Sequence, residues 1–412
     1  MIWLRETNRQ ERVTLTAAFG GFAVDAFDFM IYTFIIPTLI AAWSMSKAEA
    51  GFIATASLVS SAIGGWAAGI LADKLGRVKI LQLTIAWFAL FTFLSGFTNS
   101  YGQLMFTRMM QGLGFGGEWS VGSVLVAEMI HARHRGKAAG LVQSSWAIGW
   151  GAAAIAFSLT YSLLDAHLAW RVLFWMGVIP AALIVYIRRH VRESINFQET
   201  LAKANEVGQR TFFLEIFSPA LLKNTVLSTL LVAGMQGAYY SVSTWLPTYL
   251  KTERHLSVLN TGGYLLVLIG GSFFGYLTSA YLSDRLGRKN CFILFAVSAA
   301  VLVITYTLLP MTDAAMLFLG FPLGFFLSGI FAGTGAFLSE LFPSRMRGSG
   351  QGFCYNFGRA LGAMCPPLVG YLGNTMSLGQ AIGVMAGSAY LAVIMAALSL
   401  PETRGKILLA FD

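Results

Sequence analysis

Long apolar segments separated by short polar turns follow one another along the whole chain. Most of them are at least as long as the roughly 20 apolar residues that an α-helix needs to cross a bilayer. We expect twelve helices, at residues 13–42, 49–72, 79–98, 102–130, 137–162, 168–189, 219–249, 258–283, 290–310, 313–341, 348–374 and 378–400. The pattern predicts an all-α integral membrane protein with twelve transmembrane helices.

The composition excludes a water-soluble protein. Of the 412 residues, 56% are hydrophobic and 11% are charged, whereas soluble domains hold about 25% charged residues. The three cysteines, Cys291, Cys354 and Cys365, lie in or beside apolar runs, so we interpret them as buried packing thiols. The cysteines form no metal-ligand pair and the sequence contains no cluster with metal-ligand spacing, so neither a metal nor a cofactor is expected.

The net charge of +9 is placed as a topology signal and does not indicate a nucleic-acid-binding protein. With both termini on one side, 22 of the 28 Lys and Arg residues lie on that side, four lie on the other and two lie within helices. Because basic residues accumulate in cytoplasmic loops, both termini are expected in the cytoplasm. No small-residue cleavage site follows the first apolar segment, which is therefore interpreted as a retained helix. The expected location is a bacterial inner (plasma) membrane.

A charged turn occurs once in each half of the chain. The first copy reads Gly69-Ile-Leu-Ala-Asp73-Lys74-Leu-Gly76-Arg77-Val-Lys79. The second copy reads Ala280-Tyr-Leu-Ser-Asp284-Arg285-Leu-Gly287-Arg288-Lys289. The two aspartates are 211 residues apart, which is about half the chain and indicates an internal repeat.

Two further landmarks recur at nearly the same offset. An acid and an arginine lie seven residues apart after the fourth helix and again, 212 residues later, after the tenth: Glu128 with Arg135, and Glu340 with Arg347. The pair Arg192-Glu193 after the sixth helix is echoed by Pro401-Glu402 after the twelfth. Three landmarks at one offset predict two similar halves related by an axis along the membrane normal.

We therefore expect a six-helix bundle at 1–190, a cytoplasmic linker at 191–218 and a second six-helix bundle at 219–412. Carboxylates are favoured near helix N-termini, and arginines beside them can pair with acids across helix ends. We interpret the repeated charges as gate latches that hold the outward-facing state closed on the cytoplasmic side: Asp73, Arg77, Glu128, Arg135, Asp284, Arg288, Glu340 and Arg347.

The charged turns and a glycine-rich run on the fourth helix resemble motifs of the major facilitator superfamily. The run reads Arg108-Met-Met-Gln-Gly112-Leu-Gly114-Phe-Gly116, and the likeness covers the whole chain. The second charged turn departs from the motif at Ala280, where the family favours glycine. The resemblance implies two pseudo-symmetric six-helix bundles that work by alternating access, in a monomer.

Three shorter motifs resemble the metabolite:proton symporters of this superfamily, in particular the sialate:proton symporter branch. They are Asp25-Ala-Phe-Asp28-Phe, Gly116-Gly117-Glu118-Trp119 and Tyr355-Asn356-Phe-Gly358-Arg359. Ala26 stands where the branch carries glycine, and carriers of aromatic acids and other carboxylates share these motifs. The resemblance implies proton-coupled uptake of a small organic anion, such as a sialic-acid-like compound or another monocarboxylate.

Five ionisable residues fall inside the expected membrane helices: Asp25, Asp28, Arg108, Glu118 and Arg359. A charge at the centre of a membrane helix costs at least about 2.5–3.5 kcal/mol, so such residues are typical of functional sites. Asp25 and Asp28 share one helix face, and two nearby carboxylates in a medium of low dielectric resist being charged together. We expect Asp28, Asp25 and Glu118 to couple protons, with a purely structural role as the alternative for each.

Arg108 and Arg359 lie in opposite halves, and the planar guanidinium of each fits a carboxylate. An anionic substrate held between the halves would suit both, while the alternative for Arg108 is a structural pair with an acid on the first helix. Polar and aromatic side chains complete the expected substrate site: Tyr355, Asn356, Gln143, Gln236 and Tyr240. The alternative for the aromatic residues is packing.

The sequence thus predicts a secondary active importer that carries a proton and a small organic anion across a lipid bilayer. The alternative is a proton-coupled exporter of a small metabolite or drug, although the fifth helix lacks the Gly-Pro pair that the proton-linked antiporters of the superfamily carry. No nucleophile–base constellation occurs, so an enzyme is not expected. The polar segments are too short to hold the soluble signalling domain that a membrane sensor would need.

Overall fold

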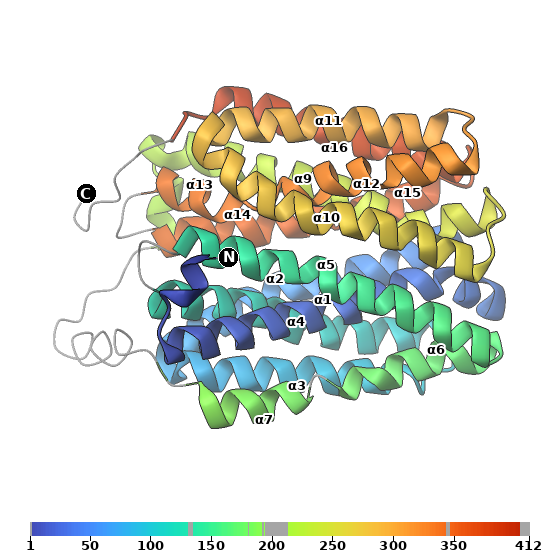
Figure 1. Cartoon of the computed structure of the whole chain (residues 1–412), viewed down its shortest axis with the longest axis horizontal. Coiled ribbons are helices and arrows are strands. Elements are labelled where there is room, and N and C mark those ends of the chain that lie inside the picture. The colour runs from blue at the N-terminus through green and yellow to red at the C-terminus, as the bar shows by residue number, and fades with distance from the viewer. Residues whose placement is uncertain are drawn as a thin grey trace.

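The fold is known from a computed structural model, which describes residues 2–130, 135–179, 181–191, 193, 213–342 and 347–403. Every regular element in these ranges is helical, which confirms the predicted all-α architecture. Figure 1 shows the helices side by side and roughly parallel, with α1–α7 on one side of the molecule and α9–α16 on the other.

The first half begins with a short 3₁₀ helix and continues with seven α-helices and a second 3₁₀ turn. These elements are η1 (Ile2–Arg5), α1 (Arg9–Trp43), α2 (Lys47–Leu75), α3 (Arg77–Ser95), α4 (Tyr101–Met129), α5 (Arg135–Leu163), α6 (Ala166–Trp175), η3 (Met176–Val178) and α7 (Ala181–His190). The second half comprises η4 (Phe213–Phe217), α9 (Pro219–Thr252), α10 (Val258–Leu286), α11 (Arg288–Leu308), α12 (Asp313–Gly329), α13 (Thr334–Leu341), α14 (Arg347–Gly362), α15 (Cys365–Leu372) and α16 (Leu378–Ser399).

Three segments that the sequence predicts as continuous helices are each divided in two. The segment 168–189 forms α6 and α7 with the 3₁₀ turn η3 between them, and the segment 313–341 forms α12 and α13. The segment 348–374 forms α14 and α15. The prediction of continuity was wrong because hydropathy measures only how apolar a segment is. It does not detect a local change in backbone hydrogen bonding.

The break between α14 and α15 follows from two adjacent prolines. Pro366 and Pro367 lie in the first turn of α15, directly after Cys365, and a proline has no N–H to donate to the carbonyl four residues earlier. The Ala363 carbonyl therefore has no such donor in its own helix. It instead accepts a hydrogen bond of 2.6 Å from the Thr55 hydroxyl of α2, which joins the two halves of the molecule.

Glycines bring matching helix pairs into contact in the two halves. A Cβ atom on Gly116 of α4 would lie 1.7 Å from the Ser61 carbonyl oxygen of α2. A Cβ atom on Gly324 of α12 would lie 1.8 Å from the Leu268 carbonyl oxygen of α10. Since only glycine permits such an approach, the α2–α4 and α10–α12 contacts are built by the same device.

Helix ends repeat in the same way. Ser46 caps α2 and Ser257 caps α10, each by accepting a hydrogen bond from a backbone N–H of the first turn. Gly76 lies between α2 and α3, and Gly287 lies between α10 and α11. Their φ values of 104° and 95° fall in a region that residues with side chains disfavour. The charged turns that first reveal the repeat therefore share one backbone geometry.

The described part of the chain contains eight helices that are long and apolar enough to cross a bilayer. Large apolar side chains on the outer faces of these helices are exposed, for example Phe318 at 82% and Leu391 at 57%. Such a surface is stable only in contact with hydrocarbon. The outer face is therefore the face that lipid covers.

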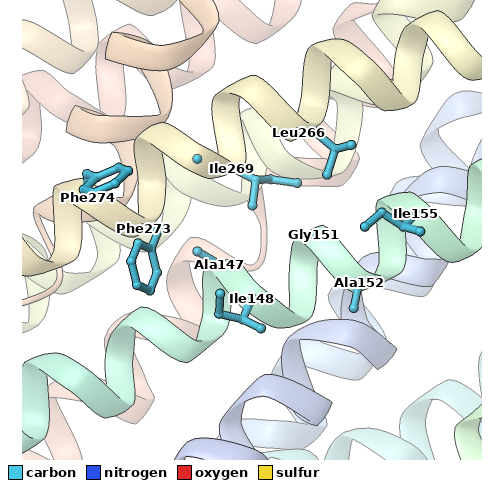
Figure 2. A pocket seen from close by; sticks show the side chains of 10 residues that line it. Ala147, Ile148, Gly151, Ala152, Ile155, Leu266, Ile269, Phe273 and Phe274 are labelled. Carbon is cyan, nitrogen blue, oxygen red and sulfur yellow. The ribbon is translucent and has the colours of Figure 1, made fainter.

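Helices α5 and α10 meet at the boundary between the halves and leave an apolar groove of about 480 Å³ on the outer surface (Figure 2). It is lined by Ala147, Ile148, Gly151, Ala152 and Ile155 from α5 and by Leu266, Ile269, Gly270, Phe273 and Phe274 from α10. The groove has no charged lining residue, so it cannot hold an anion. The ionisable residues lie elsewhere, in the interior.

Candidate functional site

An ion pair inside the first half joins Asp28 of α1 to Arg108 of α4. The Arg108 Nη1 atom lies 3.3 Å from both carboxylate oxygens of Asp28, and each residue is 1% exposed. The guanidinium also lies over the rings of Tyr32 and Phe174, at 5.8 and 5.7 Å from their centroids. Arg108 is therefore held within its own half by an acid on the first helix.

Uncharged donors complete the surroundings of Asp28. The Thr92 hydroxyl donates to one carboxylate oxygen, and the Gln111 side-chain amide donates to the other. The Ser57 hydroxyl in turn donates to the Gln111 carbonyl oxygen at 2.7 Å. Sequence reasoning missed these partners, although a detectable signal was present, because Gln111 lies one helical turn after Arg108 and therefore on the same face of α4.

Asp25 and Glu118 form a second acidic site between α1 and α4. Both are buried, at 0% and 2% exposure. Glu118 reaches α1 beside Gly21, where an added Cβ atom would lie 2.1 Å from the Glu118 Oε1 atom. Neither carboxylate oxygen of Asp25 has a hydrogen-bond partner among the described residues, and Glu118 is the acid that interacts most strongly with Asp25 electrostatically. The two acids are therefore bonded only if one of them carries a proton.

Arg359 of α14 is a buried guanidinium with two donor atoms that have no partner in the described part of the chain. It is 3% exposed, and its Nη2 atom donates a long hydrogen bond of 3.5 Å to the Tyr355 hydroxyl. Its Nε and Nη1 atoms have no partner. It also interacts electrostatically with Asp25 of the first half, so a cation of one half is near an acid of the other.

Aromatic rings from both halves surround Arg359. Its guanidinium carbon lies 5.0 Å from the ring centre of Tyr355, 5.6 Å from that of Phe115 and 5.7 Å from that of Trp119. The indole N–H of Trp119 donates to the Gln143 carbonyl oxygen of α5 at 3.4 Å. This arrangement brings Tyr355, Gln143 and Arg359, all expected in the substrate site, into one connected cluster.

The remaining expected ligands differ in their surroundings. Tyr240 of α9 is 3% exposed, packs at 5.6 Å against the Phe29 ring of the first half and interacts electrostatically with Arg359. Gln236 lies one turn earlier on α9, where its Cβ atom faces Gly362 of α14. Asn356 uses its amide N–H to bond the Gly352 carbonyl of its own helix at 3.0 Å. Tyr240 therefore joins the Arg359 cluster, and the Asn356 amide group is partly engaged in its helix.

A separate ionic cluster lies at the helix ends that the sequence assigns to the cytoplasmic side. Arg288 contacts Glu340 through two nitrogen–oxygen pairs, at 3.1 and 3.3 Å. The Thr403 hydroxyl donates to the same glutamate at 2.5 Å, and the Ser283 hydroxyl accepts from Arg288 at 3.0 Å. In the second half, the predicted latch residues Arg288 and Glu340 are thus in contact.

In each half, one glutamate after the last helix caps the helix that follows the charged turn. Glu193 accepts hydrogen bonds from the backbone N–H groups of Arg77 and Val78, at 3.0 and 3.1 Å. Glu402 accepts from those of Arg288 and Lys289, at 2.9 and 3.1 Å. A carboxylate at a helix N-terminus satisfies free donors and complements the helix dipole. The sequence flagged this pair only as a repeat.

Five predicted latch residues have side chains outside the described part of the structure: Asp73, Glu128, Arg135, Asp284 and Arg347. Arg77 is described, and its Nη1 atom donates to the Ala72 carbonyl at 3.2 Å.

Comparison with known proteins shows which family this arrangement belongs to. The family described as Major Facilitator Superfamily matches residues 18–323. A probable 4-methylmuconolactone transporter of Cupriavidus pinatubonensis is 41% identical over 403 residues, covering 98% of this chain and 93% of the relative. The cis,cis-muconate transport protein of Acinetobacter baylyi is 29% identical, with coverage of 95% and 94%. The sialic acid transporter NanX of Escherichia coli is 26% identical, with coverage of 93% and 92%.

The fold is likewise similar to that of a solved structure. The crystal structure of a D-xylose-proton symporter superposes with a TM-score of 0.78 at 19% identity, covering 97% of this chain and 100% of the other. The resemblance in the charged turns and helix motifs is therefore confirmed, including the likeness to metabolite transporters. The chain belongs to the Major Facilitator Superfamily, and it is a multi-pass membrane transporter, not an enzyme.

Proposed function

We propose that the protein takes up a small organic anion together with a proton. The observation that carries this proposal is Arg359, a buried arginine at the boundary of the two halves with two donor atoms free in the described structure. A buried cation without a hydrogen-bonded acid is unfavourable, and a substrate carboxylate supplies the missing acceptor through a bidentate bond.

The proton is carried by the pair Asp25 and Glu118. These carboxyls bond each other only when protonated once, and the charges near Asp25 come from Glu118, Asp28 and Arg359. When both acids are ionised, they attract Arg359 and compete with a substrate for it. When the pair holds a proton, Arg359 is free to bind the substrate carboxylate. One guanidinium thus links proton binding to substrate binding.

Asp28 has a different role in this proposal. Its carboxylate already accepts from Arg108, Gln111 and Thr92, so these contacts make it a structural partner of Arg108. Of the two readings that the sequence leaves open for these residues, the structural pair is the one that their contacts favour. Coupling then falls to the acids that have no basic partner within their own half.

Transport follows by alternating access of the two halves around this central site. The site residues come from α1 and α4 on one side and from α9 and α14 on the other, so rocking of the halves separates them. The ionic contacts at the charged turns close the cytoplasmic end. We place the protein in a bacterial inner membrane as a monomer, with both termini in the cytoplasm, because basic residues concentrate on that side.

The test is uptake into proteoliposomes. The purified full chain is supplied with sialic, lactic, hydroxybenzoic and cis,cis-muconic acids, with and without an inward proton gradient. We expect uphill accumulation of at least one acid, and a protonophore should abolish it. Failure of every acid to move, together with gradient-driven export of neutral or cationic compounds, would establish an exporter and overturn the proposal.

A further inference from the structure

One aromatic contact in the site has an unusual geometry. The rings of Trp119 and Tyr355 lie face to face, with centroids 4.1 Å apart and planes 7° from parallel. Trp119 belongs to α4 of the first half, and Tyr355 belongs to α14 of the second. Most other aromatic pairs at the boundary are tilted or edge-on, as for Trp146 with Tyr239 and for Phe29 with Tyr240. Among the described aromatic pairs that cross the boundary, this pair is the one with two flat, opposed faces.

Each ring is oriented by its own half. The Trp119 indole bonds to Gln143 of α5, and the Tyr355 hydroxyl accepts from Arg359 of α14. No hydrogen bond between the two rings is present, so stacking is what joins them. The halves can therefore move the rings apart without breaking either hydrogen bond.

The free edge of Arg359 lies beside this stack. Its guanidinium carbon is 5.0 Å from the ring centre of Tyr355 and 5.7 Å from that of Trp119. A carboxylate that bonds to the free Nε or the free Nη1 atom is consequently held close to the seam between the rings. The rest of the same small molecule then falls between the two ring faces, or directly beside them.

We propose that Trp119 and Tyr355 form an aromatic clamp that selects planar, conjugated carboxylates. The acid lies between the rings while Arg359 binds its carboxylate, so this inference rests on the proposed function of Arg359. One stacked layer is about 3.5 Å thick, and the rings would move from 4.1 Å to about 7 Å apart. With no substrate bound, Trp119 and Tyr355 stack on each other.

The aromatic rings around Arg359 also favour planar, conjugated acids as substrates. Phe115 adds a third ring beside Arg359, and stacked rings gain most from a flat π-system. A puckered saturated acid is thicker than one layer and holds the rings too far apart for close contact. A polyhydroxylated acid would bury hydroxyl groups against ring faces that offer few hydrogen bonds. Conjugated acids should therefore bind more tightly than saturated or sugar-like ones.

The test compares acids that differ only in planarity. Binding of benzoate and cyclohexanecarboxylate, and of cis,cis-muconate and adipate, is measured by calorimetry on the purified full chain in lipid nanodiscs. We expect the planar member of at least one pair to bind at least tenfold more tightly. Trp119→Leu and Tyr355→Leu should each remove most of that preference, whereas Trp119→Phe should keep most of it. Trp66→Leu, at a 62% exposed site on the outer surface, is the matched control and should change nothing.

The outcomes separate this inference from the function on which it rests. If both members of each pair bind equally well to the wild type, or if Trp119→Leu and Tyr355→Leu keep the preference, the clamp is wrong. If binding in that case is still lost in Arg359→Gln, the proposed carboxylate site stands without the clamp. If no acid of any kind binds to the wild type, both proposals are overturned.

Discussion

The two halves of the transporter share the residues that build the helix packing, but they differ in the residues that form the central site. Helix caps, glycine contacts and the glutamates that hold α3 and α11 recur at offsets of 208 to 211 residues. The four ionisable residues inside the first half do not recur. At the corresponding positions the second half carries uncharged residues: Gln236 for Asp25, Tyr239 for Asp28, Gly320 for Arg108 and Ile330 for Glu118.

The difference separates two tasks. The first half holds the three buried acids of the site, Asp25, Asp28 and Glu118. The second half contributes Tyr240, Tyr355 and Arg359, and the described residues include no acid that is hydrogen-bonded to Arg359. A repeated scaffold can thus place a proton site and an anion site on opposite walls of one boundary, because the packing residues repeat while the lining residues are free to differ.

The largest expected effect is a loss of folding stability when the Asp28–Arg108 ion pair of the first half is broken. Asp28→Leu leaves Arg108 buried without its acid, and breaking a buried pair in this way costs about 3–5 kcal/mol of folding free energy. The double variant Asp28→Leu with Arg108→Leu should recover most of that loss. Both changes are measured as thermal unfolding of the detergent-solubilised protein. A single variant as stable as the wild type would contradict the structural role of this pair.

A substitution at Arg359 should lower substrate affinity and leave thermal stability unchanged, in contrast to Asp28→Leu. Arg359→Lys keeps the charge but loses the bidentate fork, so substrate affinity should fall by about 10- to 100-fold, the equivalent of the 1.5–3 kcal/mol of a charged hydrogen bond. Thermal stability should be unchanged or slightly higher, because no hydrogen-bonded acid is left without its partner. Titration calorimetry with a transported acid measures the affinity. An affinity equal to that of the wild type would show that Arg359 does not bind the carboxylate.

The smallest expected effect tests the symmetry itself. Glu193→Gln and Glu402→Gln each weaken a carboxylate cap at a helix N-terminus, which is worth about 0.3–1 kcal/mol. We expect similar losses of thermal stability in the two variants, since the capping distances agree within about 0.1 Å. A loss confined to one half would show that the repeated geometry serves different purposes in the two halves.

The sequence was sufficient to predict the all-helical architecture and its internal repeat. Twelve apolar segments and landmarks at one offset predict an all-helical repeat, since hydropathy and turn chemistry are local properties of the chain. The breaks in three segments were missed, although Pro366 and Pro367 signal one of them. A proline pair in an apolar segment predicts a break only when its effect on backbone hydrogen bonds is considered.

The sequence predicted which residues belong to the site, but it did not predict which of them interact with each other. Asp25 and Asp28 lie on one face of α1, yet Asp28 forms an ion pair with Arg108 and Asp25 interacts electrostatically with Glu118. That division depends on how α1 is rotated against α4, which no local pattern records. The stack of Trp119 on Tyr355 joins residues 236 positions apart in different halves, so it too could be found only from the packed structure.

The proposed uptake depends most directly on proton coupling by the pair Asp25 and Glu118. Proteoliposomes containing Glu118→Gln or Asp25→Asn separate uphill uptake, driven by an inward proton gradient, from exchange of labelled for unlabelled acid without a gradient. Glu253→Gln, which alters a cap on α16 outside the site, is the control. We predict that both site variants lose uphill uptake and retain exchange, while the control keeps both. Normal gradient-driven accumulation in either site variant would contradict the account.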